Sequence, residues 1–110
     1  GNAENIIEDI TFENCRIELT KTSKWQCGLY DLRPCLDWGV ESYDNSAFFI
    51  RYAKDVTIMK TKTRWGNLCD SYKYAIDAAN VENLELCRFD GHSVDESIDD
   101  YKLDNVSLVK

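Results

Sequence analysis

A short acidic segment holds the residues whose types could support acid–base chemistry. The set is His92 with Asp90, Asp95, Asp99 and Asp100. A histidine that titrates near neutral pH beside carboxylates can act as a general acid or base. The alternative, which we favour, is an exposed acidic loop with one incidental histidine. We therefore assign no catalytic residue, and the spacing of the carboxylates matches no calcium-binding loop.

A second group has the composition of a carbohydrate-binding surface. Sugar rings expose apolar C–H faces that stack on aromatic side chains, while polar groups bind their hydroxyls. The candidate carbohydrate-binding residues are Trp25, Tyr30, Arg33, Trp38 and Tyr43. The alternative is that these rings only cover the side or the end of the core. Arg51 and Arg64 could contact uronate carboxylates, but solvated arginines or arginines paired with a neighbouring strand are the simpler expectation.

Cysteine usage argues against a metal site. The five cysteines are Cys15, Cys27, Cys35, Cys69 and Cys87. None forms a Cys-x-x-Cys pair and His92 is the only histidine, so a zinc site would need scattered thiols. Cys27 and Cys35 flank a loop-like segment and are the pair we expect to form a disulfide. Cys15 and Cys87 are expected to be small buried hydrophobic residues.

Composition argues against several classes of function. The 110 residues suffice for one domain, or part of one, and 44% of them are apolar. A net charge of -7 argues against a nucleic-acid partner and against electrostatic binding to anionic membranes. We find no apolar run long enough to span a bilayer, no signal peptide at the start and no cofactor motif. We expect no cofactor and no metal.

Four similar six-residue stretches predict the strands that would position the candidate residues. Each reads apolar, charged, Asp or Asn, apolar, polar, apolar, and they start at residues 7, 53, 81 and 103. Successive starts are 46, 28 and 22 residues apart, and the first gap is close to two of the last. A motif that returns at such intervals indicates a stacked repeat architecture.

Each repeat predicts a strand that follows a corner. The last three residues alternate between apolar and polar, which is the period of a half-buried strand. The preceding residue is Asp9, Asp55, Asn83 or Asn105, and these types tolerate a left-handed backbone corner. Residues 1–110 are therefore expected to form a single all-β domain, a parallel β-helix of about four or five coils.

Loops are expected at three places in this domain. The segment of about residues 21–45 is interpreted as a coil distorted by an inserted loop, because Leu29 to Pro34 matches only half of the motif. Pro34 would remove a ladder hydrogen bond there. Further loops are predicted for residues 66–73 and 91–100. Binding groups commonly lie on such loops.

Residues 47–58 and 74–86 resemble the late coils of polygalacturonase-like proteins, the family 28 glycoside hydrolases. Residues 7–15 are similar to the Ile-x-Asn-Ile-x-Phe-x-Asn phrase of the same family. The resemblance implies a right-handed parallel β-helix, a pectin-lyase-like solenoid, whose parent cleaves pectic polysaccharide with inversion. It also implies an extracellular or periplasmic location and a polysaccharide or oligosaccharide partner.

The catalytic motifs of that family do not transfer to this sequence. Asn-Thr-Asp and Arg-Ile-Lys are absent, Gly91-His92-Ser93 lacks the second glycine, and Asp99-Asp100 follows the histidine instead of preceding it. We therefore expect the C-terminal part of a longer hydrolase, inactive alone. Two alternatives stay open, namely a carbohydrate-binding module that uses the aromatic loop and a structural β-helix that associates end to end through its exposed strand edge.

Overall fold

The computed structural model describes residues 1–31 and 40–110, and in those ranges every regular element is a β-strand. The all-β expectation is thus confirmed for the described residues. The strands are β1 (Ile7–Glu13), β2 (Arg16–Leu19), β3 (Leu29–Asp31), β4 (Val40–Ser42), β5 (Phe48–Trp65), β6 (Ile76–Asp90) and β7 (Tyr101–Val109). Within the same ranges there is no helix that could cross a membrane.

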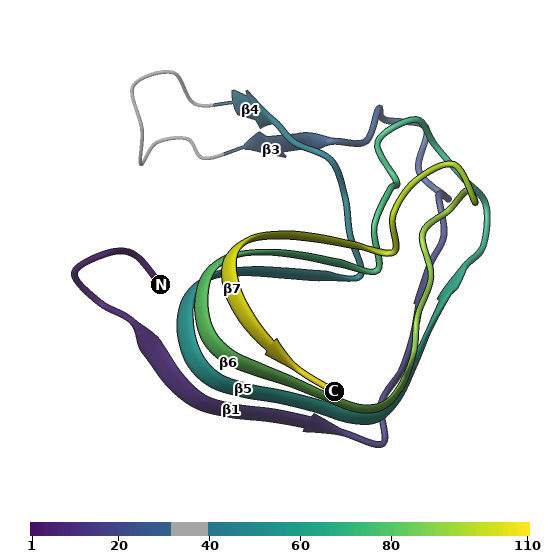
Figure 1. The fold of residues 1–110 in the computed structure, drawn as a ribbon. Coiled ribbons are helices and arrows are strands. Elements are labelled where there is room, and N and C mark those ends of the chain that lie inside the picture. The colour runs from purple at the N-terminus through teal and green to yellow at the C-terminus, as the bar shows by residue number, and fades with distance from the viewer. Residues whose placement is uncertain (32–39) are drawn as a thin grey trace.

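Five of the strands form one sheet in which every pair is parallel. The order is β1-β5-β6-β7, and β2 pairs with the later part of β5. In Figure 1 these strands follow one another along the same curved path, with β1 on one side of β5 and β7 beyond β6. Parallel neighbours need a connection that returns the chain to the same end of the sheet. The segments after β5 and after β6 provide it, where loops were expected.

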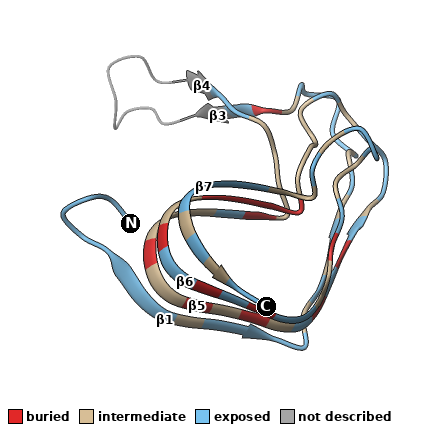
Figure 2. Cartoon of the chain, viewed as in Figure 1, coloured by how far each residue is buried: buried red, intermediate tan, exposed pale blue. Residues whose placement is uncertain are grey.

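The pairing places like residues over one another and so builds the core. Val56 lies opposite Leu84, and Ile58 lies opposite Leu86. The fully buried apolar side chains belong almost entirely to β5 and β6, the two inner strands (Figure 2). Alternate residues point inward because the side chains of a strand alternate between its faces. The inner strands therefore hold the core, and the outer ones cover it.

Three columns of left-handed residues bend the strands. Among residues 1–31 and 40–110, nine residues other than glycine have a positive φ between 48° and 61°. By strand register they form three columns of three. The columns are Asp9, Asp55 and Asn83; Asn14, Lys60 and Arg88; and Tyr52, Asn80 and Asn105. Asn and Asp adopt this conformation most readily among non-glycine residues. The strands consequently turn at matching positions, which gives them the common curve seen in Figure 1.

The fourth sequence motif lies one corner away from its predicted place. We aligned Asn105 with Asn83, but Val106 pairs with Val81, and the Asn105 Nδ2 donates to the Asn80 Oδ1 at 2.8 Å. The Asn83 Nδ2 instead donates to the Asp55 Oδ1 at 2.8 Å. The alignment was wrong because Asn80 is also followed by an apolar residue and then a polar one, so two successive corners look alike in sequence.

Between β2 and β5 the chain leaves the parallel sheet. β3 and β4 pair with each other as an antiparallel two-stranded sheet, which projects away from the stacked strands in Figure 1. The described part of the half-motif, Leu29–Asp31, is therefore not a strand of the parallel sheet, and the expectation of a coil strand there was wrong. The reason is that Ile7 pairs directly with Ala53, which leaves no strand position between β1 and β5. The insertion expected near residues 21–45 corresponds to this excursion.

Candidate functional site

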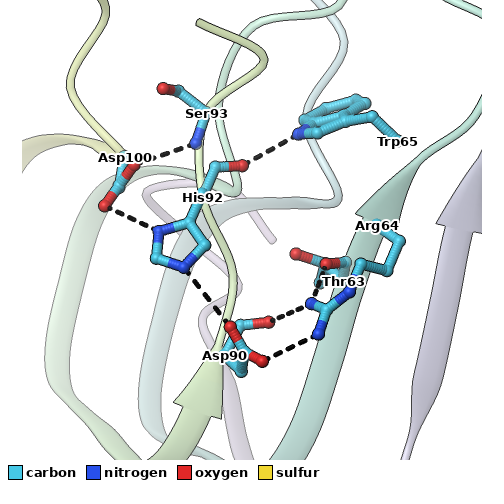
Figure 3. A network of polar contacts seen from close by, with 7 residues as sticks. All are labelled: Thr63, Arg64, Trp65, Asp90, His92, Ser93 and Asp100. Atoms are coloured by element: carbon cyan, nitrogen blue, oxygen red, sulfur yellow. Dashed lines mark hydrogen bonds and ion pairs between the residues drawn. The ribbon is translucent and has the colours of Figure 1, made fainter. Parts of the chain in front are cut away.

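A polar network joins the ends of β5 and β6 to the segment that leads to β7 (Figure 3). At its base, the Arg64 Nη2 donates to the Asp90 Oδ2 at 2.8 Å. The Arg64 Nη1 donates to the carbonyl oxygen of Thr63 at 2.8 Å and to that of Asp90 at 3.4 Å. One guanidinium thus holds a carboxylate and two backbone carbonyls, and it fixes the end of β6 against β5.

His92 lies between two carboxylates of this network. Its Nε2 is 3.3 Å from the Asp90 Oδ1, and its Nδ1 is 3.3 Å from the Asp100 Oδ2. A neutral imidazole can donate from only one nitrogen, whereas the imidazolium can donate to both carboxylates. Each ring nitrogen thus faces one carboxylate oxygen. Of the four aspartates grouped with His92 in the sequence, Asp90 and Asp100 contact the ring.

The other two aspartates of the predicted set have different positions. The Asp95 Oδ1 accepts a hydrogen bond from the backbone N–H of Ser97 at 3.0 Å, which stabilises the turn at that point. Asp99 lines the same open depression as His92 and Glu96. Both aspartates thus belong to the acidic loop that we favoured in the sequence.

The loop of residues 91–100 is closed on itself by Ser93. The backbone N–H of Ser93 donates to the Asp100 Oδ1 at 2.9 Å, and its hydroxyl donates to the carbonyl oxygen of Ile98 at 2.8 Å. The Trp65 Nε1 donates to the carbonyl oxygen of His92 at 2.8 Å. These bonds attach the loop to β5 at one end and to the start of β7 at the other.

The electrostatics keep both network carboxyls ionised. The hydrogen bond from Arg64 lowers the pKa of Asp90, and the hydrogen bond from the backbone of Ser93 lowers the pKa of Asp100. A general acid needs the opposite shift, because it must keep its proton near neutral pH. The network is therefore suited to holding the loop of residues 91–100 in place, and poorly suited to proton transfer.

A second arginine repeats the first arrangement thirteen residues earlier. The Arg51 Nη2 donates to the Asp77 Oδ1 at 2.9 Å, and its Nη1 donates to the carbonyl oxygens of Ile50 and Asp77, both at 3.0 Å. The guanidinium also lies over the ring of Phe49, 4.0 Å from its centre. Both arginines thus pair with a neighbouring strand, one of the alternatives considered from the sequence.

The structure brings two of the five predicted sugar-binding residues to one depression. Trp25 and Tyr43 line it, with 72% and 45% of their surfaces exposed. Tyr30 lies in β3, where the structure does not describe its side chain, and Arg33 and Trp38 lie outside the described residues. The prediction for these three residues stays a prediction.

Two lysines at this depression were missed in the sequence. Lys21 and Lys24 line it together with the two aromatic residues, and the Lys24 ammonium lies 5.1 Å from the centre of the Trp25 ring. Both lysines directly precede the aromatic segment in a chain that is acidic overall. That local basic composition is the signal that could have identified them.

The expected pairing of Cys27 with Cys35 is wrong, because Cys27 forms a disulfide with Cys69. The physical reason is that the segment before β3 lies beside the segment after β5. The backbone N–H of Lys21 donates to the carbonyl oxygen of Asn67 at 2.8 Å, which brings the two cysteines within reach. Sequence proximity suggested the wrong partner.

The two free cysteines of the described residues are less buried than expected. Cys15 is half-buried and Cys87 is exposed, so the expectation of small core residues was wrong. Cys87 follows the buried Leu86 in β6, and alternation along the strand turns its side chain outward. Neither thiol is part of the polar network.

Comparison with known proteins adds no assignment. No protein-family model matches the chain, and neither a curated protein nor a solved structure matches it. In residues 1–31 and 40–110 there is also no group of three acidic, histidine or cysteine side chains arranged to hold a metal ion. The functional argument therefore depends on the strands, corners and side chains described above.

Proposed function

We propose that the chain is the C-terminal, non-catalytic portion of a polygalacturonase-like hydrolase, folded as a right-handed parallel β-helix, in which it completes the scaffold that acts on pectic or related polysaccharide. The three columns of left-handed corners carry this proposal. Together with parallel pairing of β1, β5, β6 and β7, they support a chain that repeats one path with the same turns. The sequence resemblance supplies the substrate class.

The state of the carboxylates supports a non-catalytic role. Inverting hydrolysis needs one protonated carboxyl and one carboxylate that activates water. Asp77 and Asp90 are each bound by an arginine. Asp90 and Asp100 each lie 3.3 Å from a ring nitrogen of His92. The lowered pKa values of Asp90 and Asp100 argue against either residue as a general acid near neutral pH.

Two assays test this proposal. The purified chain should release no reducing ends from polygalacturonate, and release by this chain would overturn the non-catalytic role. The reading frame upstream of Gly1 should encode further repeats with the Asn-Thr-Asp, Asp-Asp and Gly-His-Gly motifs in that order. An unrelated domain there would overturn the assignment to a pectic hydrolase. An extracellular or periplasmic location belongs to the same proposal, and disulfides persist in such compartments.

Sugar binding at the Trp25 depression is a second candidate function. The specific observation is that two exposed aromatic rings, Trp25 and Tyr43, line one depression with Lys21 and Lys24. Stacking on an aromatic face and hydrogen bonds from ammonium groups are the contacts a sugar ring needs. Trp25→Ala should abolish oligosaccharide binding in calorimetry. Leu68→Ala, at an exposed apolar residue between β5 and β6 that does not line the depression, should leave binding unchanged.

End-to-end association is the third candidate, and it treats the chain as an interaction protein. β1 is the last strand on its side of the sheet, and Ile6 and Ile7 are 53% and 47% exposed there. An uncovered strand edge invites pairing with another chain. Light scattering should then show a mass that rises with concentration, and a monomer at every concentration would reject this candidate.

A further inference from the structure

We propose that the Cys27–Cys69 disulfide assembles the depression around Trp25, so that oligosaccharide binding there requires the oxidised protein. This inference rests on the sugar-binding function proposed above. It adds how that site is built and what controls it. The argument starts from the two walls of the depression.

The two walls come from segments far apart in the sequence. One wall is the segment of residues 21–28 with the base of the hairpin at residues 42–44. The other is residues 69–71, in the connection between β5 and β6. The disulfide crosses from one wall to the other over a sequence separation of 42 residues. It is therefore the covalent link between the two sides of the site.

The segment that carries Trp25 is attached mainly at its two ends. At the first end, the backbone N–H of Lys21 donates to the carbonyl oxygen of Asn67 at 2.8 Å. At the second end stand the disulfide of Cys27 and, one residue further on, Gly28, whose carbonyl oxygen accepts from the backbone N–H of Tyr43 at 2.8 Å. Between them the contacts are local, such as the bond from the Trp25 N–H to the Ser23 Oγ at 3.0 Å. Trp25 lies two residues from Cys27, so the disulfide is the attachment nearest to it on that side.

Tyr43 is held differently. Its backbone N–H donates to the carbonyl oxygen of Gly28 at 2.8 Å, and the N–H of Asn45 donates to the carbonyl oxygen of Ser71 at 2.6 Å. Gly28 has a φ of +82° and packs so closely that a Cβ there would lie 2.7 Å from the Ser71 Cβ. Reduction should therefore loosen Trp25, whereas Tyr43 keeps its bond to Gly28 and Asn45 keeps its bond to Ser71. Binding should weaken because ordering the freed segment around a ligand costs conformational entropy.

The ligand chemistry follows from the side chains. The exposed indole of Trp25 offers a face for a pyranose ring, and Lys21 and Lys24 can donate to its hydroxyls or to a carboxylate. On reduction, the disulfide takes up two electrons and two protons and yields two thiols, while dithiothreitol is oxidised to its cyclic disulfide. No other reactant is needed.

Calorimetric titration of the whole chain with trigalacturonate and with cellotriose tests the inference. The oxidised protein should bind at least one of them, and dithiothreitol should weaken that binding by about tenfold or more. The Cys15→Ser/Cys87→Ser variant, which keeps the disulfide, should bind like the unaltered protein. Equal binding by the oxidised and reduced proteins would overturn the inference. No binding of either sugar by the oxidised protein would overturn the sugar-binding function itself.

A second measurement keeps the test valid if reduction also loosens the sheet. Binding and oxidation are linked, so a sugar that binds only the oxidised form must make the disulfide harder to reduce. A saturating sugar should thus shift the dithiothreitol midpoint for the Cys27–Cys69 pair to a higher concentration, and Trp25→Ala should abolish the shift. An unchanged midpoint in the presence of a bound sugar would reject the inference.

Discussion

Two arginine–aspartate pairs link β5 to β6, and they differ mainly in their surroundings. Arg51 with Asp77 and Arg64 with Asp90 have the same sequence separation and the same pattern of bonds, to the preceding carbonyl, to the aspartate carbonyl and to its carboxylate. The side chains of the first pair are 30% and 7% exposed, whereas both side chains of the second are 44% exposed.

The difference in exposure shows that the same arginine–aspartate arrangement can have two structural roles. A carboxylate that is removed from water depends strongly on its partner, because leaving it unpaired is costly. An exposed pair contributes little to global stability. The exposed pair instead extends to His92 and Asp100 and so controls a loop (Figure 3). We infer that the first pair stabilises the sheet and the second positions the segment that leads to β7.

We expect Arg51→Met to cause the largest loss of stability. It leaves the Asp77 carboxylate buried without its cation, so the free energy of unfolding should fall by about 3 kcal/mol. Urea denaturation measures this, and Arg64→Met is the matched control, with a much smaller change expected. Equal losses in the two variants would contradict the assigned difference in burial.

The double variant Arg51→Met/Asp77→Leu tests whether the unpaired carboxylate causes that loss. Replacing both members of a buried pair with apolar side chains removes the unpaired charge, so stability should return to within about 1 kcal/mol of the unaltered protein. The same denaturation experiment measures the recovery. If the double variant is as unstable as Arg51→Met alone, the loss does not come from an unpaired carboxylate.

Acid should open the loop of residues 91–100. The pKa values of Asp90 and Asp100 are lowered in the folded protein, so their contribution is present above 3.8, the ordinary value, and is lost as the pH falls through their lower folded values. Amide hydrogen exchange at Ser93 should therefore accelerate in that range. Asp100→Asn should remove most of this dependence, because an amide does not ionise. Unchanged exchange at Ser93 throughout acid titration would contradict the role of the network.

Trp65→Phe should give the smallest effect. It removes the hydrogen bond to the carbonyl oxygen of His92 but keeps a ring beside Tyr72, whose centre lies 5.4 Å from that of Trp65. Global stability should change by no more than about 1 kcal/mol. Exchange of the amides next to His92 should still increase. A large global loss would show that Trp65 supports the sheet itself.

Local patterns predicted the strands well and their neighbours less well. Alternation identified the stretches that contain Asp9, Asp55 and Asn83, and these three residues do form one column of corners. Asn105 was misplaced because its context fits two corners equally. The register there depends on the bulge between Val81 and Leu84, which no local pattern reveals.

The candidate sites were harder to predict because they depend on which residues of neighbouring strands lie side by side. The separation of 26 residues in both arginine–aspartate pairs becomes meaningful only once β5 and β6 are known to pair with an offset of 28. The pairing of Cys27 with Cys69 likewise requires knowing that Lys21 lies beside Asn67. Trp25 and Tyr43, chosen from their residue types, do line one depression, and sugar binding there stays a prediction.

A crystal structure of the chain tests the central proposal most directly, because it shows both the hand of the path and the columns of corners. We predict right-handed parallel coils in which Asp9, Asp55 and Asn83 form one column and Asn105 lies on Asn80. Antiparallel pairing of β5 with β6, a left-handed path, or Asn105 beside Asn83 would contradict the account.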